Sequence, residues 1–364
     1  MLPYFVLILV PLILAILEIN GKRNSNSIFY LILFVLIVGG TDGNGLDWFG
    51  TNGTDGYAFI DYRGLGYDDL INFEPGFVFV NKLLGKFHIF LLLMSFTCYL
   101  LVWGVIKQEC KYKFIGLFVF IASMTLYCYM GVYRHAIAQT LIIYSWKFRN
   151  SRKLQSLILF MACLFHYSAI IAFLYLFIPK NKIISIKVFI LLLVLGVLIR
   201  SSIMPILSVI AAFMPGNTAN KFDYYIATGS SDEAFSITLL LFRIFTFLLA
   251  YYYINKKSSR DIFFVNTFAI SIILYVTICI SPSFGRMIMF FSCTEIILIP
   301  LILERTKEKI LLHRQNTSCR LSNNKYYNFF NVYFYLFVIL YLYQYFNYLI
   351  GWRDIYIPYN SILI

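Results

Sequence analysis

The chain has 364 residues, of which 60% are hydrophobic and only 13% are charged. This composition excludes a soluble enzyme, a disordered regulator and a disulfide-rich secreted domain. The net charge of +13 comes from short basic clusters between long apolar runs, a pattern typical of cytoplasmic loops and not of nucleic-acid binding. The runs are unbroken and do not alternate, which excludes an outer-membrane barrel. We therefore predict an all-α fold, a polytopic membrane bundle.

Apolar runs that are candidate membrane spans follow one another along the chain. They cover residues 2–19, 28–40, 89–106, 114–130, 132–146, 154–178, 186–213, 235–254, 262–281, 286–303 and 329–350. Arg200 and Pro205 interrupt the run 186–213, which predicts two short helices or a re-entrant pair there. The sequence thus predicts about 10–12 transmembrane helices, in a single polytopic membrane domain over residues 1–364.

The distribution of charge predicts the orientation of the bundle. The basic loops hold 18 of the 30 Lys and Arg residues, so we place them in the cytoplasm. They are 20–27, 107–113, 147–153, 255–261 and 304–328. Segment 41–88 carries seven of the 17 carboxylates, and we place it outside. A second outer loop is predicted at 214–234.

The outer loop 41–88 is the least membrane-like part of the chain. Its Gly-rich stretches cannot lie exposed in lipid, because their backbone groups would lack partners. Aromatic and acidic residues alternate in it, among them Asp55, Tyr57 and Asp61. Such residues suit sugar rings, although an ordinary solvated loop would have the same composition. Glu74 precedes Pro75-Gly76 where the loop re-enters the membrane, so we expect its carboxylate near the arginines.

Three arginines are candidates for contact with an anionic substrate. An Arg within a span costs about 2.5–3.5 kcal/mol and usually faces a cavity or a partner. Arg134 and Arg286 both map near the outer surface, where two guanidinium groups can clamp a pyrophosphate. The alternative is that they reach toward lipid headgroups. Arg243 lies within a span, where Glu295 or Asp223 would neutralise it.

His166 lies within a predicted span, in the sequence Phe165-His-Tyr-Ser168. A buried histidine there is either a general base or a hydrogen-bonded structural residue. The seven cysteines include no CxxC pair or Cys/His spacing, so we expect no metal site and no cofactor.

Three elements, taken in order, resemble the EpsG-like family of bacterial exopolysaccharide polymerases, which is allied to the Wzy O-antigen polymerases. They are Gly53-Thr-Asp-Gly-Tyr57 with Phe73-Glu-Pro-Gly-Phe77, then Val132-Tyr-Arg-His-Ala-Ile-Ala138 with Leu164-Phe-His-Tyr-Ser-Ala169, then Phe284-Gly-Arg-Met287. Pro358-Tyr359 also fits. In three places the chain departs from the family pattern. A duplicated Thr41-Asp-Gly43 precedes the family-like copy. His135 replaces the usual Gln, and Gly56 separates Asp55 from Tyr57.

The resemblance implies a polymerase of the glycosyltransferase type in the bacterial inner membrane, with its active face toward the periplasm. Its substrate would be an oligosaccharide on undecaprenyl pyrophosphate, and its product an O-antigen of lipopolysaccharide, a capsule or an exopolysaccharide. A chain-length regulator in the same membrane is a possible partner. We expect Asp55, Glu74 and His166 to be catalytic. The expected substrate-binding residues are Arg134, Arg286, Tyr57, Asp61 and Arg243.

Two other functions fit the same residues. A lipid-linked oligosaccharide flippase would also hold arginines in a cavity, but it would be expected to show internal repeats, and none is found among the motifs. A membrane O-acyltransferase would use His166 as its base and would not need the acidic outer loop. Surface polysaccharide from a deletion strain separates the three functions.

Overall fold

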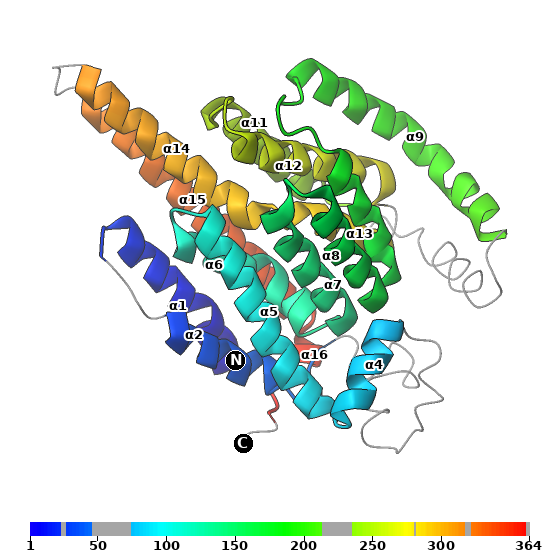
Figure 1. Cartoon of the computed structure of the whole chain (residues 1–364). Coiled ribbons are helices and arrows are strands. Elements are labelled where there is room, and N and C mark those ends of the chain that lie inside the picture. The colour runs from blue at the N-terminus through cyan, green and yellow to red at the C-terminus, as the bar shows by residue number, and fades with distance from the viewer. Residues whose placement is uncertain (23–26, 46–73, 213–234, 280–281, 317–321, 362–364) are drawn as a thin grey trace. The chain divides into compact units, whose positions relative to one another are not determined.

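The computed structural model describes residues 1–22, 27–45, 74–212, 235–279, 282–316 and 322–361. These residues form two compact units. Unit 1 comprises Met1–Leu176 and Ile299–Ile364, and unit 2 comprises Phe177–Leu298. Each unit is a bundle of helices (Figure 1).

The described residues confirm the predicted all-α membrane bundle. Five helices are long and apolar enough to cross a membrane: Leu2–Ile19, Phe87–Glu109, Ser259–Ile278, Phe284–Lys309 and Phe330–Gly351. Shorter apolar helices accompany them at Ile28–Gly39, Pro75–Leu84, Lys113–Tyr129, Tyr167–Phe177 and Ile237–Tyr253. The chain is therefore a multi-pass membrane protein.

Unit 1 contains most of the helices. They are α1 (Leu2–Ile19), α2 (Ser27–Phe34), η1 (Val35–Gly39), α4 (Pro75–Leu84), α5 (Phe87–Glu109), α6 (Lys113–Phe120), η3 (Ile121–Tyr129), α7 (Tyr133–Ser145), η4 (Trp146–Phe148), α8 (Arg152–Phe165), η5 (Tyr167–Phe177), α15 (Ser322–Gly351) and α16 (Arg353–Tyr356). Helix α5 packs on η1 and α7, α7 packs on α8, and α4 contacts both α5 and α8. The two halves of unit 1 meet where α15 packs on η3.

Several predicted spans change helix type part of the way along. The predicted span 114–130 is an α-helix to Phe120 and then a π-helix from Ile121 to Tyr129. The predicted span 154–178 is an α-helix to Phe165, and a 3₁₀-helix follows from Tyr167. Such changes of helix type are frequent at functional sites. Here they place Arg134 and His166 next to helix breaks.

Buried tyrosines join the beginning and the end of the chain within unit 1. The hydroxyl of Tyr4 donates to the carbonyl oxygen of Tyr356 (2.6 Å), and that of Tyr345 donates to the carbonyl oxygen of Tyr4 (3.0 Å). The hydroxyl of Tyr356 donates to the carbonyl oxygen of Leu126 in the π-helix (2.8 Å). Buried hydroxyl and carbonyl groups need such partners where water is excluded. Helices α1, α15, α16 and η3 are thereby held together.

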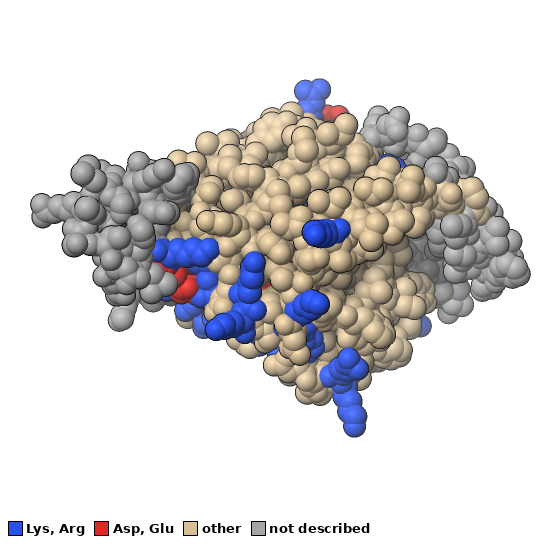
Figure 2. Space-filling view, turned by 90° about the horizontal axis from the view of Figure 1, so that it is seen from above, with Lys and Arg blue, Asp and Glu red and all other residues tan. Residues whose placement is uncertain are grey.

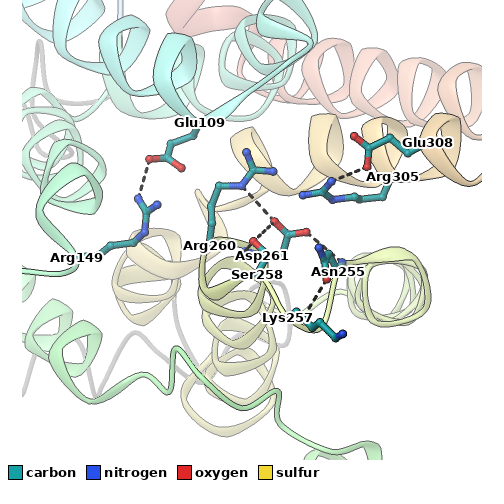
Figure 3. A network of polar contacts seen from close by, with 9 residues as sticks. All are labelled: Glu109, Arg149, Asn255, Lys257, Ser258, Arg260, Asp261, Arg305 and Glu308. Carbon is teal, nitrogen blue, oxygen red and sulfur yellow. Dashed lines mark hydrogen bonds and ion pairs between the residues drawn. The ribbon is translucent and has the colours of Figure 1, made fainter.

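Polar contacts bring the predicted cytoplasmic loops of unit 1 to one end. Glu18, at the end of α1, accepts hydrogen bonds from the backbone N–H groups of Lys113 and Phe114 (both 2.9 Å). Arg149 donates to Glu109 (2.7 Å; Figure 3). Lys111 lies 3.9 Å from Glu308, and Arg305 donates to Glu308 (2.5 Å). The face drawn in Figure 2 shows many basic and few acidic side chains.

Unit 2 is built around α12 (Ser259–Ile278). Helices α9 (Ile186–Ala212), α11 (Ile237–Tyr253) and α13 (Pro282–Ser292) all contact it. The turn before α12 is fixed by Asp261, which accepts from the Ser258 hydroxyl (2.9 Å) and the Asn255 backbone N–H (3.1 Å) and pairs with Arg260 (3.2 Å; Figure 3). Because Ser258 in turn accepts from the Asp261 N–H, the turn resembles a capping box.

The prediction of two short helices in 186–213 is wrong, because α9 is one helix of 27 residues that contains Pro205. A proline removes one backbone hydrogen bond, and membrane helices tolerate this loss. Arg200 does not interrupt the helix either. Its guanidinium donates to the carbonyl oxygens of Val276 (3.1 Å) and Cys279 (2.9 Å), near the end of α12.

The predicted loop 304–328 is mostly helical. Helix α14 (Glu295–Asn316) continues through its first half, and α15 begins at Ser322. Residues 317–321 lie outside the described part. Lys, Arg and Glu are good helix formers, so a basic cluster indicates where the lipid ends and not where a helix ends. The predicted span 286–303 lies within Phe284–Lys309, a stretch long and apolar enough to cross a membrane, in which α13 ends at Ser292 and α14 begins at Glu295.

Candidate functional site

Three charged or ionisable side chains meet at the end of unit 1 opposite the basic loops. Arg134 Nη1 donates to Glu74 Oε2 (2.5 Å), and His166 Nδ1 lies 3.1 Å from Glu74 Oε1. The ring of His135 lies edge-on to that of His166, with the ring centres 5.4 Å apart. We call Glu74, Arg134 and His166 the carboxylate cluster. Arg134 and His166 are 60 and 92 residues from Glu74 in the sequence. The packing of the helices therefore brings the three side chains together.

Glu74 is placed by the first turn of α4. Pro75 begins the helix, where its fixed φ fits and its missing N–H costs nothing. Gly76 lies against α8: a Cβ at this position would be 2.8 Å from the carbonyl oxygen of Leu164. Only glycine allows this approach without displacement. The Pro75-Gly76 pair therefore brings Glu74 next to the end of α8. His166 is the residue that follows this helix in the sequence.

Arg134 is placed by the turn between η3 and α7. Gly45 packs against this turn. Its φ of +118° is one that glycine adopts readily, and a Cβ at this position would overlap the carbonyl oxygen of Met130. The hydroxyl of Tyr133 donates to the carbonyl oxygen of Asn44 (3.3 Å). The segment before the predicted outer loop thus supports the first turn of α7, which carries Arg134.

Asn44 in turn binds the last residues of the chain. Its Nδ2 donates to the carbonyl oxygen of Pro358 (3.0 Å), with longer contacts to those of Ile355 and Tyr356 (3.3 and 3.4 Å). Its Oδ1 accepts from the Asn360 backbone N–H (2.9 Å). The sequence alone predicted no role for Asn44. The family-like Pro358-Tyr359 was the only available signal.

The Glu74 carboxylate is the buried centre of the cluster. Glu74 precedes α4 and lies outside the helices that could cross a membrane. Burial acts to raise its pKa, but the hydrogen bond from His166 and the charge of Arg134 outweigh burial and lower the pKa from 4.5 to about 2. Glu74 is therefore ionised at every physiological pH.

The three members of the cluster differ in exposure. The side chain of Glu74 is 6% exposed, whereas those of His166 and Arg134 are 16% and 24% exposed. A molecule that reaches the cluster from outside therefore meets the imidazole and the guanidinium before the carboxylate. Such a surface suits a ligand that carries negative charge and a proton to give up.

The other candidate residues are placed elsewhere or lie outside the described part. Asp55, Tyr57 and Asp61 are outside the described residues. Arg243 belongs to unit 2, where it is buried, with its Nε 3.6 Å from Glu295 Oε1 and its guanidinium over the Tyr275 ring. This is the neutralising contact that the sequence suggested. Arg286 lies on α13 of unit 2, and its joint action with Arg134 stays a prediction.

Sequence reasoning placed Glu74 near the arginines, and the structure brings it to Arg134. It did not foresee that His166 shares the same carboxylate. The order of the family-like motifs was the available signal, because all three members of the cluster belong to them. Within the described residues, no three His, Cys, Asp or Glu side chains are arranged to hold a metal ion.

Residues 27–361 match the model of the EpsG family. The comparisons with curated proteins and with solved structures find no match. The family-level resemblance seen in the motifs is therefore confirmed, since the match includes all three parts of the carboxylate cluster and the C-terminal segment bound by Asn44. The chain belongs to the EpsG family.

Proposed function

We propose that this protein is a polysaccharide polymerase that joins undecaprenyl-pyrophosphate-linked oligosaccharide units at the outer face of the bacterial inner membrane. Membership of the EpsG family supports a polymerase-type function in general. The observation that carries the finer proposal is the carboxylate cluster, in which a guanidinium and an imidazole lie on one buried carboxylate.

The cluster offers what this transfer needs. The departing pyrophosphate gains negative charge, which a guanidinium stabilises by planar, charge-assisted hydrogen bonds. The N-terminal ends of α4 and α7 lie next to Glu74 and Arg134, and helix N-termini favour anions. The acceptor sugar hydroxyl must lose a proton, and the cluster contains an imidazole.

The position of the cluster also supports the proposal. In unit 1 it lies at the end opposite the contacts of Glu18, Glu109 and Lys111, where the basic loops gather. Basic loops stay in the cytoplasm. The cluster then faces the periplasm, the side on which lipid-linked units would be joined.

A deletion strain complemented with variants tests this function. Arg134→Gln should leave surface polysaccharide of one repeat unit, because polymerisation fails and export continues. The matched control is Arg149→Gln, which removes a similar guanidinium paired with buried Glu109 at the opposite end of unit 1. It should keep a ladder of polymer lengths. Loss of every surface repeat in the deletion strain would indicate a flippase, and full-length polymer without acyl groups would indicate an acyltransferase.

A further inference from the structure

Both oxygens of the Glu74 carboxylate are engaged by the protein. Oε2 accepts from Arg134, and Oε1 lies at hydrogen-bond distance from His166 Nδ1. The side chain is 6% exposed. A general base must point a lone pair at the proton that it removes, and Glu74 directs its oxygens at two side chains of its own chain. A carboxyl whose pKa is about 2 is also a weak base at neutral pH.

The contact with Glu74 fixes the tautomer of His166. An ionised carboxylate only accepts hydrogen bonds, so Nδ1 carries the proton and donates it to Glu74 Oε1. Nε2 of the neutral ring is then the nitrogen that accepts a proton. An imidazole oriented by a carboxylate in this way is a recurring arrangement for a base.

The backbone and a second ring hold His166 in place. His166 is the residue where α8 ends, with extended φ and ψ of −156° and 113°, and its N–H donates to the carbonyl oxygen of Ala162 (3.0 Å). The ring of buried His135, on α7, lies edge-on to it. Among the described residues, Glu74 before α4 and Arg134 and His135 on α7 are charged or titratable groups that lie around His166.

From this geometry we propose that His166 is the general base of the transfer and that Glu74 is a positioning residue, which orients His166 through Nδ1 and Arg134 through Nη1. The inference rests on the proposed polymerase function and assigns the roles within its site. It departs from the expectation that Glu74 is itself catalytic.

The step balances without any further reactant. The acceptor hydroxyl oxygen attacks the anomeric carbon of the lipid-linked chain and forms the new glycosidic bond. The bond from that carbon to the pyrophosphate oxygen breaks, and its electron pair leaves with the lipid pyrophosphate. The hydroxyl proton passes to Nε2 of His166. Arg134 faces the departing pyrophosphate, and the proton later returns to water.

The test is a rate measurement on purified protein in lipid nanodiscs, with lipid-linked repeat units extracted from the deletion strain. The variants are His166→Gln, Glu74→Gln and Glu74→Asp, each compared with wild type from pH 5 to pH 9. His166→Gln should lower the rate by about 10²–10⁴-fold, the usual contribution of a general base. Glu74→Asp keeps the charge and should retain the wild-type pH profile at a reduced rate.

Glu74→Gln gives the decisive profile. Its amide oxygen still accepts from Nδ1, but the negative charge that favours the imidazolium is lost. The acid limb of the rate should therefore move to lower pH, and a purely structural role would leave the limb in place. An unmoved limb, or a His166→Gln rate within threefold of wild type, would overturn these roles. If wild-type protein makes no polymer from these units, the proposed function itself fails.

Discussion

Gly76 in the first turn of α4 packs closely on the carbonyl group of Leu164, near the end of α8. A Cβ at position 76 would lie 2.8 Å from the Leu164 carbonyl oxygen. This single approach sets the distance between Glu74 and His166, which lie two residues away on either side of the contact. The carboxylate cluster therefore depends on a residue that contributes no functional group.

Gly76→Ala should lower polymerisation about tenfold to a hundredfold, because the added Cβ must push α4 away from α8 and misplace the cluster. The measurement is polymer length in the complemented deletion strain, with protein level checked by blot. The control is Gly104→Ala in α5, where the nearest atom to an added Cβ is a Lys147 Nζ at 3.7 Å. Wild-type polymer from Gly76→Ala would contradict the prediction.

Lysine at position 134 or 286 tests the predicted grip on pyrophosphate. Lysine keeps the charge but loses the planar fork. Arg134→Lys and Arg286→Lys should each slow polymerisation roughly tenfold to a hundredfold, as expected for a lost charge-assisted bond of about 1.5–3 kcal/mol. Arg149→Lys at the opposite end of unit 1 serves as the control. Full-length polymer from both site variants would exclude the clamp.

Acid should weaken the contribution of Glu74 to stability. Its pKa is about 2 in the folded protein against 4.5 ordinarily, which corresponds to about 3 kcal/mol. Because the folded pKa is the lower one, this stability is complete above pH 4.5 and is lost as the pH falls toward 2. In detergent, the gap in unfolding free energy between wild type and Glu74→Gln should shrink between pH 5 and pH 3. A gap that does not change with pH would contradict the lowered pKa.

Asn44→Ala should destabilise unit 1 by about 1–3 kcal/mol, since it leaves buried backbone groups of the C-terminal segment without partners. Asn44→Asp should be at least as harmful, because a carboxylate would face carbonyl oxygens. Thermal unfolding in detergent measures both. Asn331→Ala, in an open surface groove of α15, should change the midpoint little. Equal midpoints for all three variants would remove Asn44 from this role.

Reporter fusions test the orientation. A reporter that is active only in the periplasm should be active when fused at Gly66 and silent when fused at Asn316. The reverse pattern would place the carboxylate cluster on the cytoplasmic side and would contradict the proposed function.

The sequence predicted the helices well where burial in lipid alone determines them. The runs 2–19 and 89–106 became α1 and α5, because a long apolar stretch has no other way to satisfy its backbone. It failed where tertiary contacts decide. The turn at Met130, where η3 ends, packs against Gly45, which is about 85 residues away in the sequence. The sequence predicted that Glu74 lies near Arg134, because Glu74 stands where the predicted outer loop re-enters the membrane. It did not predict that His166 contacts the same carboxylate, since that contact depends on the packing of α4 on α8.

Asn44 forms hydrogen bonds with the backbone of residues 355–360, so its surroundings are complete only after those residues have been synthesised. Arg134 and His166 are synthesised and enter the membrane well before the C-terminal segment is made, and all of unit 2 is made in between. Until that segment docks, Asn44 lacks its C-terminal partners, and η3 lacks the Tyr356 hydroxyl that donates to the Leu126 carbonyl oxygen. A nascent chain that lacks residues 355–360 therefore lacks part of the support for the turn that carries Arg134.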